Sequence, residues 1–184
     1  MTDKIAKWRK WVELACSDCG NLMLSRDMFV DLHDMIAKNE QMQQNDYFHV
    51  YMRDTYVAHA FMMLRKHIKV HPDSISLADA VSDMLANIDQ LPERSGAGAL
   101  QEAFTLFAEK AAKVEGFADR VIAHRDKRTP RHTPTYREID EAIDSMDQLA
   151  IQASLAVGAS YSDTCKPTVQ GGWLNVFKDM GIEA

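Results

Sequence analysis

Apolar side chains recur at steps of three and four residues along most of this chain, and the strict alternation of a half-buried strand is hard to find. The clearest stripe lies in residues 100–122 and consists of Ala103, Phe104, Phe107, Ala111, Val114, Ala118, Val121 and Ile122. A second stripe consists of Ile139, Ala142, Ile143, Met146, Leu149 and Ala153. Because such steps place side chains on one face of a helix, the pattern predicts an all-α protein, a compact bundle of at least four long helices.

The first third of the chain shows the same periodicity with one interruption. Residues 3–44 are expected to be helical but bent or broken near Gly20, because glycine weakens a helix by about 1 kcal/mol relative to alanine. Residues 47–70 follow as a helix that ends before Pro72. Apolar residues cover a wide arc of this helix, which predicts a central and largely buried position.

Two pairs of polar residues mark the starts of further helices. Ser76 with Asp79 begins a short helix that reaches about residue 88. Thr135 with Glu138 is a capping-box pattern, in which each side chain bonds the other residue's backbone N–H, and it opens a helix that reaches about residue 158. The second apolar stripe therefore belongs to a helix with a defined start.

The end of the chain is predicted to be a tail. Residues 165–184 are expected to finish in a short helix that docks on the bundle through its apolar side chains Trp173, Leu174, Phe177 and Met180. A chain of 184 residues with 46% hydrophobic content can bury one substantial core and does not require two. Residues 1–184 are therefore interpreted as a single domain.

Composition narrows the environment and the partners. The net charge of -6 and a pI near 5.6 argue against indiscriminate DNA binding, which needs a broad basic surface. Three cysteines do not make a disulfide framework, and neither a secretory leader nor an apolar run near membrane-spanning length is evident. We expect a soluble, reduced, cytoplasmic protein without a membrane partner.

Positive charge is nevertheless concentrated in one segment. Residues 120–137 hold six Lys or Arg and one acid, a local balance of +5. A second line of residues, mostly basic, runs beside the first stripe, and we call it the basic line. Its members are Lys110, Lys113, Phe117, Arg120, His124, Lys127 and Arg128. On an ideal α-helix, Arg120 and His124 lie about 40° apart around the axis and about 6 Å apart along it, so both side chains can reach one phosphate.

The same segment carries a family resemblance. Residues 119–127, DRVIAHRDK, followed by residues 135–139, TYREI, resemble the HEPN superfamily (higher eukaryotes and prokaryotes nucleotide-binding), in its abortive-infection AbiU-like branch. Residues 63–67, MLRKH, and 73–77, DSISL, extend the resemblance more weakly. The family implies an up-and-down bundle of four to five main helices with short extra helices, often a two-fold homodimer, and in active members RNA cleavage without metal.

Carried onto this chain, the resemblance implies an Arg/His site. Arg120, His124 and Arg125 are the candidate catalytic residues, because histidine transfers protons near neutrality and arginine donates a planar fork of hydrogen bonds to phosphate. Lys113, Lys127 and Arg128 are the candidate nucleic-acid-binding residues. A homodimer with its interface near this turn would bring two histidines together. The ligand would be RNA or a nucleotide, in a phage-defence or toxin–antitoxin type of system.

Alternative interpretations stay open at this point. Only three residues separate Arg120 from His124, a shorter spacing than is usual in active members, so a non-catalytic homodimer that binds nucleotide, RNA or a protein partner is the alternative function. Other pairings are Arg125 with His132 and Arg53 with His59. Cations in a last helical turn also stabilise a helix by about 0.3 to 1 kcal/mol without any ligand. His124 has a structural alternative beside the core.

No metal or cofactor is expected from the sequence. Cys16 and Cys19 are interpreted as structural, because this lone C-x-x-C lacks a second pair of ligands. The chain contains no Glu-x-x-His of a di-iron bundle and no phosphate-binding glycine loop. Arg65 and His67 are expected either to line the Arg120 site from a neighbouring helix or simply to end that helix.

Overall fold

The computed structural model describes residues 2–40, 42–44, 46–69, 74–92, 96–123, 132–159, 163–168 and 172–175. Within these ranges every regular element is helical, and no strand is present. The elements are α1 (Thr2–Lys38), η1 (Met42–Gln44), α2 (Asp46–Ile68), α3 (Leu77–Ala86), η2 (Ile88–Gln90), α4 (Ala97–Phe117), η4 (Ala118–Ala123) and α5 (Tyr136–Ala156). The predicted all-α class is confirmed.

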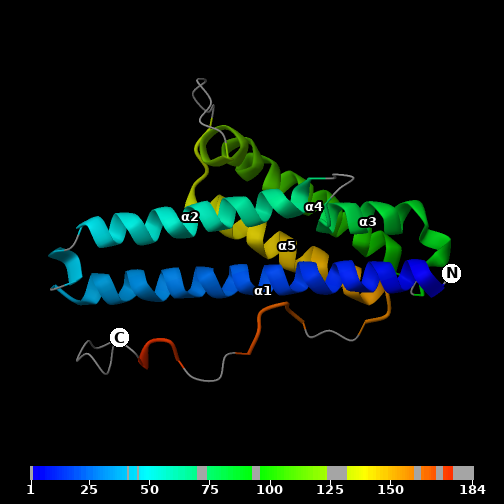
Figure 1. Ribbon diagram of the computed structural model, residues 1–184, viewed down its shortest axis with the longest axis horizontal. Helices are drawn as coiled ribbons and strands as arrows, with labels where there is room; N and C mark the ends of the chain where they lie inside the picture. The colour runs from blue at the N-terminus through cyan, green and yellow to red at the C-terminus, as the bar shows by residue number, and fades with distance from the viewer. Residues whose placement is uncertain are drawn as a thin grey trace.

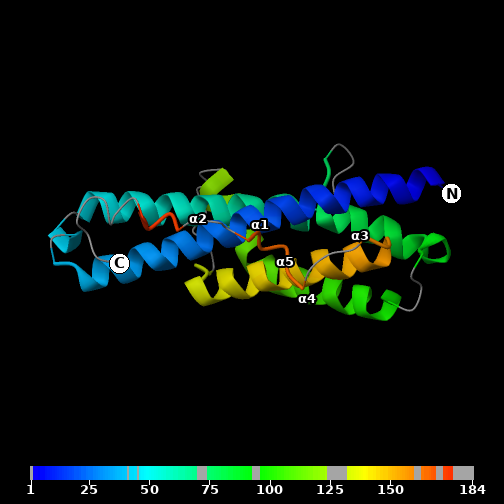
Figure 2. The same cartoon turned by 90° about the horizontal axis from the view of Figure 1, so that it is seen from below.

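Four long helices make the bundle, with the shorter α3 beside them (Figure 1). The helices α1 and α2 run antiparallel as a long hairpin, and α4 and α5 pack on each other and on that hairpin. Both views show the far end of the hairpin, where α1 gives way to α2, extending beyond the other long helices (Figures 1 and 2). The core consequently lies where all four helices overlap, and its largest buried side chains are Trp8, Phe61 and Phe107.

The predicted break at Gly20 is wrong, because α1 is one uninterrupted helix of 37 residues. A Cβ atom added at Gly20 would lie 2.6 Å from the backbone carbonyl oxygen of Cys165. Real Cβ atoms do not approach an oxygen so closely, so the glycine makes room for the C-terminal tail. Its lower helix propensity is offset by tertiary packing, which supplies most of the stability of helices in proteins.

Only half of α2 fits the predicted buried position. Ala60, Phe61 and Leu64 in its C-terminal half are buried, whereas Tyr47 is 90% exposed and Tyr51 is 67% exposed. The helix is as long as expected, but its first turns lie on the projecting end of the hairpin (Figure 1). Apolar periodicity located the helix and its apolar arc correctly but could not show which turns other helices cover.

Both predicted helix starts are confirmed. The Ser76 hydroxyl accepts the backbone N–H of Asp79 at the start of α3, and Thr135 with Glu138 forms a complete capping box at the start of α5. The short helix ends at Ala86, slightly before the predicted residue 88, because the backbone tightens into η2. In a capping box two otherwise unpaired backbone donors are satisfied, which fixes the first turn of α5.

The tail contacts α1 within the part that the structure describes. The indole Nε1 of Trp173 donates a hydrogen bond to Asp31 Oδ2 at 3.1 Å. Phe177 and Met180 of the predicted terminal helix lie outside the described residues, so that helix stays a prediction. In the described helices, no stretch is both long and apolar enough to cross a membrane.

Candidate functional site at the η4 turn

The helix that carries the first apolar stripe changes its winding where the candidate site begins. From Ala118 to Ala123 the backbone is π-helical, with hydrogen bonds from residue i to i+5, and Arg120 lies inside this turn. Isolated π-turns are rare and occur frequently at functional sites. The angle of about 40° between Arg120 and His124 assumed α-helical geometry, which does not hold through Ala123. His124 itself lies outside the described residues.

Arg120 is half-buried and its guanidinium makes no ion pair or hydrogen bond within the described residues. Its neighbour in the sequence behaves differently. Asp119 accepts hydrogen bonds from Arg65 Nε and from Lys69 Nζ, the latter at 2.6 Å. Arg65 lies in the last turn of α2, and Lys69 directly follows that helix. An arginine without a carboxylate partner keeps all five donors for a ligand. Within the described residues, Arg120 can therefore bind a phosphate without first breaking an ion pair, unlike Arg65 and Lys69.

Asp119 ties the end of α2 to the η4 turn. Partial burial by itself would raise the pKa of Asp119, but the hydrogen bonds from Lys69 and Arg65 hold that pKa below its usual range. Lys69 Nζ also lies 3.4 Å from Glu115 Oε1 on α4. Arg65, which we expected either to line the site or to end its helix, thus lies beside residue 119 but is already paired.

His67 has a structural role and does not face a ligand site. Its side chain is only 1% exposed, Nδ1 accepts the backbone N–H of Leu77, and Nε2 bonds Asp18 Oδ2 at 3.0 Å. Because Nδ1 is the acceptor, the neutral ring carries its proton on Nε2 and donates it to Asp18. Burial lowers the pKa of His67, although the bond to Asp18 acts in the opposite direction. Of the two roles expected for His67, these contacts support the structural one at the end of its helix.

The α4 part of the predicted basic line is matched by acids on α5. Lys113 Nζ lies 2.9 Å from Glu138 Oε1, and Lys110 Nζ lies 3.0 Å from Glu141 Oε2. The Thr135 backbone N–H, followed by Lys113 and His132, lowers the pKa of Glu138 far below its usual range. RNA binding by Lys113 stays a prediction, and it requires this lysine to exchange Glu138 for a phosphate.

The alternative Arg/His pairs are placed only in part. His132 Nε2 bonds Glu138 Oε2 at 2.9 Å and so belongs to the start of α5. Arg53 is exposed and pairs with the adjacent Asp54. His59 lines a hollow beside the same helix. The candidate residues His124, Arg125, Lys127 and Arg128 lie outside the described residues. Of the six candidate site residues, the structure therefore places Arg120 and Lys113.

Two features were missed at the level of the sequence. One is a hollow of about 240 Å³ near the projecting end of the hairpin, between α1 and α2 and closed in part by the tail. Most of its lining is apolar, including Met28, Phe29, Leu32, Phe48, Met52, Tyr56 and Trp173. The other is a group formed by Cys19, Cys165 and Asp147. Both depend on the tail, whose path over the helices has no local sequence signal.

Comparison with known proteins shows the family of the chain. No curated protein and no solved structure matches the chain. The family model described as AbiU2, of the HEPN type, matches residues 5–168, from the first turn of α1 to beyond the end of α5. This match covers most of the chain, including the Arg120 turn and the capping box of α5. The protein therefore belongs to the AbiU2 family of HEPN proteins.

Proposed function

We propose that this HEPN protein cleaves RNA without a metal ion at the η4 turn, in a phage-defence or toxin–antitoxin type of system. The observation that supports the proposal best is the state of Arg120. It is half-buried in a π-helical turn and makes no ion pair within the described residues, while the neighbouring cations Arg65 and Lys69 are paired with Asp119. A cation held in place without an acid suits the charge of a phosphate group.

The chemistry assigns one role to each candidate residue. The ribose 2′-oxygen attacks the adjacent phosphorus and loses its proton to a base, the bond from phosphorus to the 5′-oxygen breaks, and an acid protonates that leaving oxygen. The products are a 2′,3′-cyclic phosphate and a 5′-hydroxyl. His124 is the proton carrier, and Arg120 with Arg125 stabilises the charge on the phosphorus centre. Lys113, Lys127 and Arg128 hold the flanking phosphates.

A two-fold homodimer completes this proposal. One histidine per chain can act as base or as acid, and a second His124 from the partner subunit would supply the other role. Val121, in the η4 turn beside Arg120, is 38% exposed and offers an apolar contact at the place where two turns would meet. The dimer interface is accordingly proposed near η4.

A cleavage assay with chelator present tests the proposed reaction. Removing a positioned acid or base typically costs 10² to 10⁴ in rate, so His124→Ala should lower the rate of RNA cleavage by about that factor. His33→Ala is the matched control, because His33 lies on α1, bonds the Phe29 carbonyl of its own helix and belongs to none of the candidate Arg/His pairs. Equal cleavage by the wild-type protein and His124→Ala would exclude His124 as the proton carrier. If His132→Ala then lost the activity, the alternative pair of Arg125 with His132 would carry it, and if neither variant lost activity, the cleavage would come from a contaminant.

The second candidate function is a homodimer that binds nucleotide, RNA or a protein partner without cleaving. Only three residues separate Arg120 from His124, and the π-helical turn changes the angle between successive side chains, which favours this alternative. Wild-type protein that binds single-stranded RNA through Arg120, with an affinity that falls as salt rises, yet leaves it intact would support binding over catalysis.

A further inference from the structure

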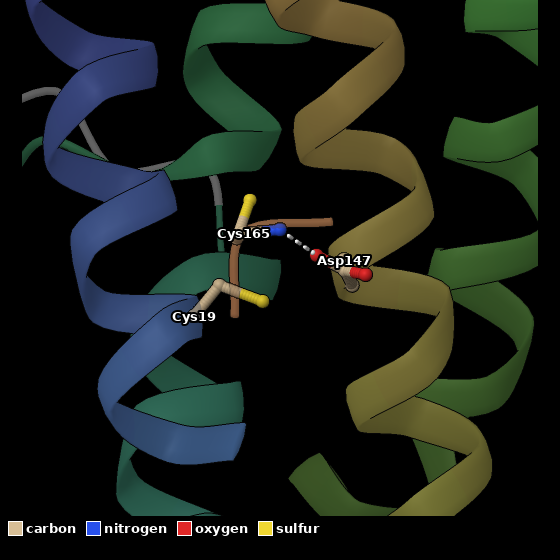
Figure 3. A group of neighbouring side chains, drawn as sticks. All are labelled: Cys19, Asp147 and Cys165. Carbon is tan, nitrogen blue, oxygen red and sulfur yellow. Dashed lines mark hydrogen bonds between the residues drawn. The ribbon is translucent and has the colours of Figure 1, made fainter. Parts of the chain in front are cut away.

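Two of the three cysteines lie beside one carboxylate, and the third is on the neighbouring turn of α1. Cys16 and Cys19 lie on α1, Cys165 lies in the tail, and Asp147 lies on α5. The ligand atoms of Cys19, Asp147 and Cys165 all lie within 4.8 Å of one another (Figure 3). Cys16 precedes Cys19 by about one helical turn. Its thiol lies 3.5 Å from the Ser154 hydroxyl and is outside this group, so it would have to turn to become a further ligand. Cys19 of the C-x-x-C therefore has two potential ligands beside it from distant segments.

The group is held in place by contacts that do not involve sulfur. Asp147 Oδ1 accepts the backbone N–H of Cys165 at 2.7 Å, and Asp147 Oδ2 accepts the Thr164 hydroxyl at 2.8 Å. On the other side, Gly20 lets the Cys165 carbonyl lie against α1. These contacts orient both the carboxylate and the tail. Such outer contacts are what fix the first ligands of a metal centre.

The thiols of the group lie largely out of solvent. Cys19 is fully buried and Cys165 is partly buried. A thiolate buried in this way needs a cation close to it, and a metal ion held by these ligands would supply that charge.

We propose that Cys19, Cys165 and Asp147, with Cys16 as fourth ligand, bind a thiophilic divalent cation, with Zn²⁺ as the first choice. Zinc takes four ligands from thiolates and carboxylates, at about 2.3 Å to sulfur and about 2.0 to 2.2 Å to oxygen. Tetrahedral bonds of that length place two sulfurs about 3.8 Å apart, so the group closes onto the ion with a small inward shift. Each coordinating thiol releases its proton to water, and binding should tighten as pH rises.

The ion would link three segments that are far apart in the sequence. Residues 163–168 would be fixed between α1 and α5 by metal bonds in addition to the two hydrogen bonds to Asp147. Because unfolding separates the ligands, metal binding stabilises the folded chain by mass action. The site lies apart from the η4 turn and does not depend on the proposed RNA cleavage.

Metal titration of the full chain tests this proposal. Protein treated with chelator and a phosphine reductant would be titrated with Co²⁺ and then with Zn²⁺. We expect one Co²⁺ per chain, thiolate-to-cobalt charge-transfer bands, the visible bands of tetrahedral cobalt, displacement by Zn²⁺, and a higher Tm with Zn²⁺. Cys165→Ser should lose these bands and the Tm shift. Asp163→Asn, which removes an exposed tail carboxylate outside the group, is the matched control and should bind as the wild type does.

The remaining outcomes also decide the proposal. Cys16→Ser should weaken binding at least about tenfold, and unchanged affinity would exclude Cys16 as a ligand. Cobalt bound without sulfur charge-transfer bands, or equally well by Cys165→Ser, would overturn the site. Absence of binding together with formation of a disulfide on mild oxidation would overturn it as well, in favour of a redox pair.

Discussion

The two ends of α2 are stabilised in opposite ways. At the C-terminal end, Lys66 and buried His67 bond Asp18 of α1, and Arg65 pairs with Asp119 of η4. At the N-terminal end, Tyr47 and Tyr51 project into solvent. One end is held by polar contacts whose partners come from two other elements, whereas the other presents apolar side chains.

This difference shows what apolar periodicity can and cannot establish. Large exposed apolar side chains are compatible with an amphipathic pattern, because the pattern records which residues share a face and not what covers that face. Polar contacts carry more information about position, since each needs a specific partner at a specific distance. The candidate site lies beside the polar end of α2, and the predictions below set that end against the apolar one.

The largest effect is expected from Arg120→Ala. Loss of one preorganised donor to the charged centre typically costs 10² to 10³ in rate, so RNA cleavage should fall by about that factor. The control is Arg53→Ala, at the apolar end of α2, where the guanidinium pairs with the adjacent Asp54. Initial rates with a short single-stranded RNA provide the measurement. Equal losses in both variants would contradict a special role of Arg120 and point to general attraction or to the alternative pair of Arg53 with His59.

A second difference concerns two histidines of the same helix. His67→Ala removes the partner of the Leu77 N–H and one partner of Asp18, and an unsatisfied buried group costs about 1 to 3 kcal/mol. We therefore expect the free energy of unfolding to drop by about 2 to 3 kcal/mol. His59→Ala, on the wall of the hollow, should cost less. Urea denaturation of both variants measures the difference, and similar values would mean that the His67 contacts add little to stability.

The pH dependence of stability should follow the same histidine. Burial holds the pKa of His67 below its ordinary 6.5, so the unfolded chain binds this proton more readily than the folded one. The contribution is present above pH 6.5 and is lost as pH falls below that value, at no more than about 1.4 kcal/mol per pH unit. Denaturant titrations from about pH 7 to about pH 5 measure this slope. A slope that is unchanged in His67→Gln would assign it to other groups.

Self-association tests which region pairs. If the interface lies near η4, Val121→Glu should weaken dimerisation at least about tenfold, since a charge would replace an apolar contact. Tyr47→Glu places the same charge at the projecting end of the hairpin and should leave the dimer intact. Light scattering over a dilution series distinguishes the two variants. The opposite result would move the interface to the hairpin end, and a wild-type monomer would remove the dimer altogether.

The smallest effect is expected at Lys113. Each lysine that neutralises a phosphate of single-stranded RNA contributes about 0.7 to the slope of log affinity against log salt. Lys127→Ala should lower the slope by about that amount, but Lys113→Ala by less, because Lys113 is already paired with Glu138. Fluorescence anisotropy at several salt concentrations gives both slopes. A larger change for Lys113 would show that it exchanges Glu138 for phosphate fully.

Much of the fold was predictable because it depends on local patterns. The Ser76 cap, the Thr135 capping box and the α5 stripe are present as predicted. The first stripe is buried from Ala103 to Ala118, apart from the partly buried Phe104, but Val121 at its end is exposed, where the predicted core face had placed it inside. The predicted break at Gly20 failed for the opposite reason. Glycine at this position makes room for the carbonyl of Cys165, and no local rule connects that residue with α1.

The candidate site was predictable in its residue types rather than in its geometry. The basic segment and the family resemblance identified Arg120, but the π-helical turn has no periodicity of its own in the sequence. Likewise, sequence alone could not show that Lys113 and His132 both bond Glu138, or that His67 is enclosed by Asp18 and Leu77. These contacts join residues whose proximity arises only when the helices pack.

Gly20 makes helix α1 a compromise between two requirements. Alanine at this position would favour the helix locally by about 1 kcal/mol, yet its methyl group would collide with a carbonyl of the tail. The residue that weakens α1 is thus the one that admits residues 163–168 to its surface. A substitution that raised the intrinsic stability of α1 at this position would displace the tail from the helix. The residue that is best for the isolated helix is therefore not the residue that is best for the whole protein.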